Sequence, residues 1–139
     1  MSIRRAVARL CSRQPHAGCR EALTMAKFML LLHDRPKAFA GLSPAEMQQI
    51  VLKYVAWGRR LRVKKLMVEG HKLTDSPGRV VRQKRGRPMV SDGPYAESKE
   101  LLGGYYIVKA KDYDEALHLA LDCPHVAYGT IEVRQVDEA

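Results

Sequence analysis

The sequence predicts one small α+β domain over residues 25–139, in which an antiparallel sheet carries two helices on one face. Three observations favour this fold class. Apolar runs of strand length alternate with two amphipathic segments of helix length, in the order β-α-β, hairpin, β-α-β. A chain of 139 residues has the length of one domain. Hydrophobic residues make up 46% of it, enough for a core without disulfides or metals.

The first 24 residues differ from the rest of the chain. They contain five arginines and one glutamate. No apolar segment follows the arginines, so a secretory signal peptide is not expected, although an organellar transit peptide has a similar composition. Because Met25 directly precedes the first predicted strand, we expect the leader to be disordered or to reflect a mis-assigned start.

The first β-α-β unit begins with a strand predicted over residues 27–33, which contains the continuous apolar run Phe28 to Leu32. A helix follows, because Ser43 can cap free backbone N–H groups and Glu46 can complete a capping box around Pro44. Spacings of three and four define its apolar stripe: Met47, Ile50, Val51, Tyr54, Trp57 and Leu61. A second strand is predicted over residues 66–69.

A hairpin with a basic tip is predicted next, with Gly86 supplying the turn. The polar loop 92–100 leads to a strand over 105–110. Asp112 opens the second helix, whose buried face we expect to be Ala116, Leu117, Ala120 and Leu121, and the last strand covers 130–136. This order predicts a ferredoxin-like βαββαβ sandwich with an extra hairpin. Because one sheet face has no covering element, we expect a homodimer.

The net charge of +9 is unevenly distributed. Residues 26–87 carry fifteen basic and four acidic side chains, whereas residues 88–139 carry four basic and ten acidic ones. A basic front and an acidic back could attract nucleic acid, or could pair with each other across a dimer. Aromatic residues do not alternate with the basic ones, so base stacking, and with it nucleic-acid binding, is not expected.

Other signals of compartment and cofactor are weak. The three cysteines have long spacings and no Cys-x-x-Cys pair, which favours reduced thiols in a cytoplasmic protein. No apolar run reaches the length of a membrane span. Neither a glycine-rich phosphate loop nor metal-ligand spacing is present, so we expect no cofactor and no metal.

The segment from Val90 to Tyr106 closely resembles the signature of the DGPF, or YCII-related, domain family. In that signature an Asp-Gly-Pro-Phe loop precedes Ala-Glu-(Thr/Ser)-Lys-Glu and Gly-Gly, and this chain reads Asp92-Gly93-Pro94-Tyr95, then Ala96 to Glu100, then Gly103-Gly104. The resemblance extends over about Met25 to Val136. It implies a ferredoxin-like unit that pairs into a dimeric α/β barrel.

The resemblance also implies acid/base chemistry, with one departure. Some YCII-type relatives carry a histidine on the first helix, paired with an acidic residue as a proposed catalytic dyad. This chain has Lys53 and Tyr54 in that stretch and no histidine between Asp34 and Gly70. Asp122 could supply the acidic role.

Two residues are the candidate catalytic pair. Asp92 could act as a general base if burial raised its pKa, or could form only a rigid turn in which Gly93 tolerates positive φ. His71, after the second strand, could do acid/base work nearby. His33 and Asp34 end the first strand and could face the same cleft, while His125 lies in a loop and His118 on an exposed helix face. The remaining candidates for a ligand pocket are Tyr54, Gly93, Pro94, Tyr95, Lys99 and Asp122.

These observations predict a dimeric small-molecule-binding protein with acid/base, lyase-like activity. The alternative is a non-catalytic accessory or regulatory module, because DGPF-type domains also occur beside sigma-factor regions. The sequence leaves open whether the domain is an enzyme.

Overall fold

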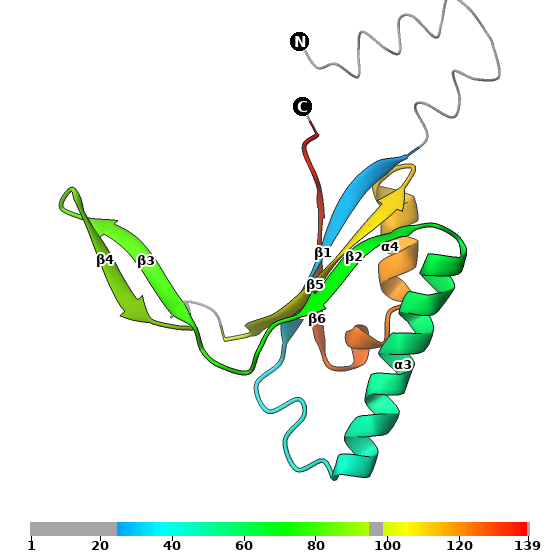
Figure 1. The fold of residues 1–139 in the computed structure, drawn as a ribbon, viewed down its shortest axis with the longest axis horizontal. Helices are drawn as coiled ribbons and strands as arrows, with labels where there is room; N and C mark the ends of the chain where they lie inside the picture. The colour runs from blue at the N-terminus through cyan, green and yellow to red at the C-terminus, as the bar shows by residue number, and fades with distance from the viewer. Residues whose placement is uncertain (1–24, 95–98, 139) are drawn as a thin grey trace, which may run out of the picture.

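The computed structural model describes residues 25–94 and 99–138 and has the predicted α+β architecture (Figure 1). Its elements are β1 (Ala26–Asp34), α3 (Pro44–Val63), β2 (Met67–Lys72), β3 (Arg79–Lys84), β4 (Arg87–Asp92), β5 (Leu101–Ala110), α4 (Tyr113–Leu121), the 3₁₀ helix η1 (Pro124–Ala127) and β6 (Gly129–Gln135). The leader and Tyr95 lie outside the described residues, so what we predict for them stays a prediction.

The main sheet has the strand order β2-β5-β1-β6, with antiparallel neighbours throughout, which confirms the ferredoxin-like arrangement. Central strand β1 places Phe28, Leu30 and Leu32 on the face covered by α3 and α4, where they pack with Trp57 and Ala116 (Figure 1). No helix in the described part of the chain is both long and apolar enough to cross a membrane.

Both helices begin at the predicted caps. Ser43 and Glu46 form the capping box, and the Asp112 carboxylate accepts a hydrogen bond from the Glu115 N–H at 2.9 Å. The predicted buried face of α4 is partly wrong, because Leu117 and Leu121 are exposed. The helix lies against the sheet through Ala116 and Ala120, and two such small residues spaced by one turn leave the leucines on the outer side. Val51 of α3 is likewise exposed.

Strands β3 and β4 form a separate hairpin that projects away from the main sheet (Figure 1). We call residues 79–92 the arm. Its tip turns through Arg85 and Gly86, both with positive φ, as predicted for Gly86. At the base of the arm the Gly93 N–H donates to the Gly78 carbonyl at 3.0 Å.

The positive φ expected of Gly93 is wrong; Gly78 has it instead, at +73°. Gly93 is needed for a different reason. A Cβ at this position would lie 2.0 Å from the Pro77 carbonyl oxygen, so only glycine permits the two chain segments to approach this closely.

Gly129 has a similar steric role at the start of β6, where a Cβ would lie 1.8 Å from the His33 carbonyl oxygen. We expect Gly129→Ala to destabilise the fold by at least about 2 kcal/mol, because the backbone of β1 or β6 must shift. Gly58→Ala is the matched control: Gly58 lies inside α3 with no atom within 4 Å of the added Cβ, and alanine should stabilise the fold by roughly 0.5–1 kcal/mol. Urea unfolding followed by circular dichroism measures both changes, and equal stability of Gly129→Ala and the wild type would contradict this role.

Candidate functional site

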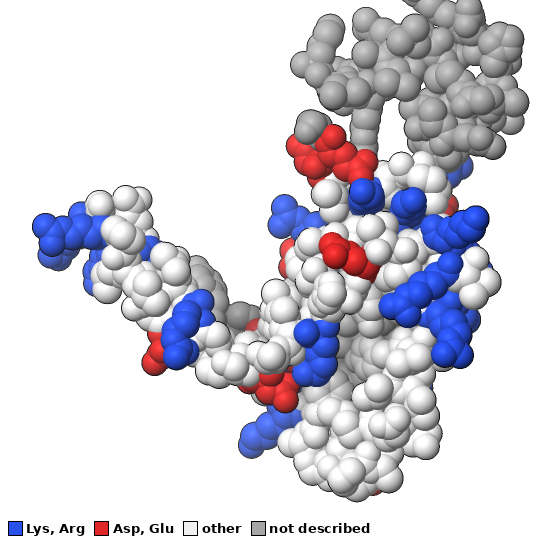
Figure 2. Space-filling model, in the orientation of Figure 1, with Lys and Arg blue, Asp and Glu red and all other residues white. Residues whose placement is uncertain are grey.

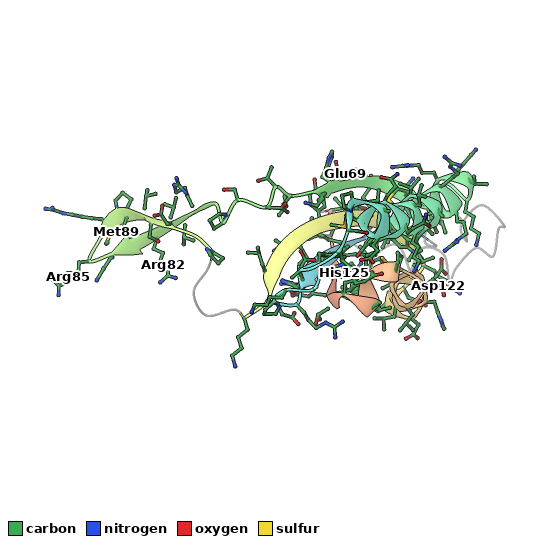
Figure 3. The ribbon with its side chains drawn as sticks, turned by 90° about the horizontal axis from the view of Figure 1, so that it is seen from below. Glu69, Arg82, Arg85, Met89, Asp122 and His125 are labelled. Atoms are coloured by element: carbon green, nitrogen blue, oxygen red, sulfur yellow. The ribbon has the colours of Figure 1, made fainter. Side chains whose placement is uncertain are left out.

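The most deeply buried polar side chain among the described residues is His125, which is 2% exposed. It lies in η1, where this short helix meets the end of β1 (Figure 3). Pro124 begins η1, and the Cys123 carbonyl accepts a hydrogen bond from the Val126 N–H. The side chain of His125, between these residues, points into the protein. A buried histidine of this kind needs a partner for each ring nitrogen.

Both nitrogens of the His125 ring have such partners. Nε2 lies 2.9 Å from the His33 carbonyl oxygen, and Nδ1 lies 2.9 Å from the Tyr54 hydroxyl oxygen. A carbonyl oxygen only accepts hydrogen bonds, so Nε2 carries the proton. In the neutral ring Nδ1 then accepts from the Tyr54 O–H, and the order of donation is fixed from Tyr54 through His125 to His33.

A carboxylate approaches the same ring. Asp34 Oδ1 lies 3.7 Å from His125 Nε2. Burial raises the pKa of Asp34, while the nearby His125 and Lys72 lower it in part. The close approach depends on Gly103 of β5, where a Cβ would lie 2.4 Å from Asp34 Oδ2. Asp34 can therefore stabilise a positive charge that forms on His125.

Tyr54 occupies the opposite end of this chain of contacts. Burial raises its pKa well above the ordinary value, with further contributions from Cys123 and Asp34. Its ring lies 6.4 Å from that of Tyr128, which in turn lies 5.2 Å from Phe39. Tyr54 therefore stays protonated near neutral pH, and its hydroxyl acts as a hydrogen-bond donor beside the aromatic ring of Tyr128.

Cys123 lies beside this cluster but is not suited to be a nucleophile. It is buried, and the loss of hydration raises the pKa of its thiol to about 11. The thiolate is the reactive form, and it is scarce at neutral pH. We name the set of Tyr54, His125 and Asp34 the relay cluster.

The structure gives the two predicted catalytic residues separate partners. The Asp92 side chain is 85% exposed and lies 3.3 Å from Arg79 Nε. That of His71 is 63% exposed, 3.7 Å from Glu69, and its ring is 5.7 Å from the ring of Tyr105. The ion-pair partners of both residues, Arg79 and Glu69, are outside the relay cluster.

The other predicted pocket residues are dispersed. Tyr54 belongs to the relay cluster, and Pro94 lines a surface hollow. Lys99 is exposed, and Asp122 is exposed at the end of α4, on the side away from the arm (Figure 3). In the described part of the chain, no three His, Cys, Asp or Glu side chains are grouped so that they could hold a metal ion.

The hollow has a volume of about 670 Å³ and lies where β2 and β5 meet the base of the arm. Its lining includes His33, Lys72, Arg79, Pro94 and Glu100. The charge of Lys72 also acts on Asp34, and His33 directly precedes Asp34 in β1, so the hollow lies next to the carboxylate end of the relay cluster.

Burial of Asp34 has a consequence for stability. Its folded-state pKa lies above 3.8, so the folded protein binds this proton more tightly than the unfolded chain does. Its contribution to the free energy of unfolding is therefore complete below pH 3.8 and is lost as the pH rises through the folded-state pKa. Asp34→Asn lacks this loss, so we expect the variant to gain stability over the wild type across that window. Urea unfolding at a series of pH values measures the difference, and parallel profiles would contradict the raised pKa.

Comparison with known proteins supports the resemblance seen in the sequence. The model of the YCII-related domain matches residues 26–139. An uncharacterised protein of Rhizobium meliloti (strain 1021) is 32% identical over 91 residues, which are 64% of this chain and 68% of that protein. A solved structure, the hydroxynitrile lyase from Passiflora edulis, is 17% identical with a TM-score of 0.40, covering 84% of this chain and 97% of the lyase. A structural similarity of this size says nothing about the reaction. By the extent of the family match, the chain belongs to the YCII-related domain family.

Proposed function

We propose that this protein binds a small molecule and transfers a proton to or from it through the relay cluster, an acid/base activity of the lyase-like class. The observation that carries the proposal is the buried His125 ring, held between the Tyr54 hydroxyl and the His33 carbonyl at 2.9 Å each, with Asp34 at 3.7 Å. A hydroxyl, an imidazole and a carboxylate in this order form the general arrangement that activates a hydroxyl group.

The proton path follows from the tautomer. A ligand X–H gives its proton to the Tyr54 oxygen while the Tyr54 proton moves to Nδ1 of His125. The ring becomes an imidazolium with protons on both nitrogens, and the Asp34 carboxylate stabilises it. The raised pKa of Tyr54 disfavours a free tyrosinate, so the two proton movements must be concerted. Return of both protons to a product restores the starting state.

In this proposal the reacting X–H group of the ligand contacts Tyr54, and the rest of the ligand extends to the hollow at the Asp34 end of the relay cluster, whose lining does not include Tyr54. Lys72 and Arg79 on its wall favour a ligand with an oxygen anion or a carbonyl group, although each also pairs with a carboxylate, Lys72 with Asp75 at 3.0 Å and Arg79 with Asp92 at 3.3 Å. Lys72 lines the hollow, and its charge lowers the pKa of Asp34. Ligand binding and the protonation of Asp34 should therefore influence each other.

The proposal includes a homodimer through the open face of the main sheet. On this face Met29 and Leu31 of β1 pair with Ile107 and Tyr105 of β5. The neighbouring positions on the edge strands are charged or ionisable: Glu69, His71, Glu132 and Arg134. An apolar centre inside a polar rim is the usual composition of a protein interface, and pairing two such faces would give the dimeric barrel implied by the resemblance.

The acid/base role predicted for Asp92 and His71 stays a prediction, and one assay separates it from the relay cluster. Incubation with a panel of ketones, aldehydes and 2-hydroxy acids in D₂O, followed by NMR, reveals which C–H bonds exchange. We expect Tyr54→Phe to slow exchange by about 100-fold or more, the usual range for loss of an acid/base group. Phenylalanine keeps the ring packing and removes only the hydroxyl.

The control is His118→Ala, which removes an exposed histidine of α4 and should leave exchange unchanged. If Asp92→Asn or His71→Ala abolishes exchange while Tyr54→Phe does not, the roles belong to the pair predicted from the sequence and the relay is wrong. If no panel member exchanges yet some bind with the same affinity to the wild type and to Tyr54→Phe, the non-catalytic alternative is favoured.

The homodimer makes its own prediction. Leu31→Glu places a charge in the centre of the open sheet face, and desolvating an unpaired carboxylate there should abolish dimerisation. Val63→Glu is the matched control, because Val63 lies exposed on α3. Size-exclusion chromatography with light scattering gives the mass of each variant. A Leu31→Glu protein that remains dimeric would show that another surface forms the dimer.

A further inference from the structure

The arm concentrates positive charge at its outer end. Residues 79–92 contain five basic side chains and one acidic one, Asp92, which pairs with Arg79 at the base of the arm at 3.3 Å. Every residue of β3 and β4 is exposed except Val80, which is partly buried. The other four basic side chains lie toward the tip, so Lys and Arg cover the far end of the arm in Figure 2.

The strand pairing brings most of this charge to one face of the arm. Lys84 pairs directly with Arg87, and Arg82 pairs with Met89 on the same side of the ribbon. We call the side that carries these four residues the basic face. Arg85 lies next to it, in the turn at the tip (Figure 3).

The charges of the basic face repel one another within the chain. Lys84 and Arg87 are directly opposite, and like charges in this position destabilise a pair of strands. Arg82 adds a third charge on the same face about 7 Å along the strand. An isolated two-stranded hairpin is only marginally stable in water, so this repulsion is costly. A bound polyanion would remove it, which indicates that the arm is built to meet one.

The opposite face of the arm argues against a membrane as that polyanion. It carries Val81 paired with Val90, together with the ion pair of Arg79 and Asp92. The valine pair stabilises the ribbon itself through its cross-strand contact. A segment that binds an anionic membrane brings its apolar and basic side chains to the same surface. Here the two kinds of side chain point in opposite directions, so a membrane would contact only one of them.

The shape of the arm fits duplex DNA. Two paired strands lie about 5 Å apart, and the major groove of B-DNA, about 12 Å wide, admits a two-stranded β-ribbon. The deep and narrow major groove of duplex RNA does not. Residues 79–92 contain no aromatic side chain that could stack on the bases of a single strand. The lack of aromatic residues among the basic ones therefore counts against single strands and not against a duplex, whose bases stay stacked.

We propose that the arm binds duplex DNA by lying in the major groove, with its basic face and Arg85 in contact with backbone phosphates. Phosphate contacts carry no sequence information, so the binding is independent of sequence. The arm projects away from the main sheet and both helices (Figure 1), so bound DNA need not approach the acidic side chains of α4 and β6. This binding is separate from the proton transfer proposed for the relay cluster.

Fluorescence anisotropy of a short, labelled DNA duplex of mixed sequence, titrated with the full chain, tests the proposal. We expect binding at about 0.05 M NaCl. Four phosphate contacts give a slope of about −3.6 for log affinity against log salt, so raising NaCl to about 0.2 M should weaken binding roughly 150-fold. Absence of DNA binding by the wild type at the lower salt concentration would overturn the proposal.

The decisive variant removes the four outer charges of the arm together: Arg82→Gln, Lys84→Gln, Arg85→Gln and Arg87→Gln. It should weaken binding at about 0.05 M NaCl by at least about 100-fold and lose most of the salt dependence. Glutamine keeps long polar side chains and removes the repulsion, so the arm should fold at least as well as in the wild type. Amide hydrogen exchange of β3 and β4 checks that it does.

The matched control removes the same number and kind of charges from the exposed surface of α3: Lys53→Gln, Arg59→Gln, Arg60→Gln and Arg62→Gln. Charges outside the contact act only through screened, long-range attraction, so this variant should lose less than about tenfold in affinity. Equal losses in the two variants would show that net charge, and not the arm, binds the DNA. If duplex RNA or an acidic peptide of equal charge binds the wild type as tightly as the DNA duplex does, the arm is a general polyanion contact and the proposal is wrong.

Discussion

The hydrogen bond from His125 to the His33 carbonyl joins the parts of this protein that its site depends on. It connects η1, which follows α4, to the C-terminal end of the central strand β1. The backbone of β6 begins only two residues after η1, and Gly129 is what allows this start to lie against His33. The Arg35 N–H also donates to the Tyr128 carbonyl at 3.1 Å, so the same corner is held from both sides. With the ring fixed there, Tyr54 of α3 and Asp34 of β1 meet on opposite sides of one imidazole.

This arrangement divides the molecule into regions with different properties. The helix-covered side of the sheet contains the core and, at one end, the relay cluster. The open side has an apolar centre with charged edges, suited to a second subunit. The arm extends from the same end of β2 and β5 that borders the hollow, since Arg79 and Val80 line that hollow. The hollow proposed to bind the ligand therefore borders the base of the arm.

Local signals in the sequence were sufficient for most of the fold. Ser43, Pro44 and Glu46 start α3 through contacts within four residues, and the apolar run of β1 needs no knowledge of its neighbours. The errors concern which face of an element is buried. Leu117 and Leu121 are more apolar than Ala116 and Ala120, but the two alanines permit the closer approach to the sheet.

The relay cluster was harder to predict because its members are joined only by tertiary structure. The sequence offers Tyr54, Asp34 and His125 only as separate candidates. Tyr54 and its hydrogen-bond partner His125 are 71 positions apart in the chain. The signature loop around Asp92 identified the family and was therefore favoured as the site. In the structure the loop needs glycine at position 93 because the backbone there packs closely on Pro77, and the Asp92 side chain faces solvent. The clearest missed signal was glycine: Gly103 and Gly129 each make room for a member of the relay cluster or for its anchor.

In the relay cluster the neutral His125 ring accepts a hydrogen bond from the Tyr54 hydroxyl and donates one to the His33 carbonyl. Nitrogen-15 NMR of the histidine rings at neutral pH tests it directly, because protonated and bare ring nitrogens resonate in well-separated regions. We expect a bare Nδ1 and a protonated Nε2 for His125, and in Tyr54→Phe a shift of the Nδ1 signal with little change at Nε2. A protonated Nδ1 in the wild type, or a Nδ1 signal indifferent to the loss of the Tyr54 hydroxyl, would contradict it.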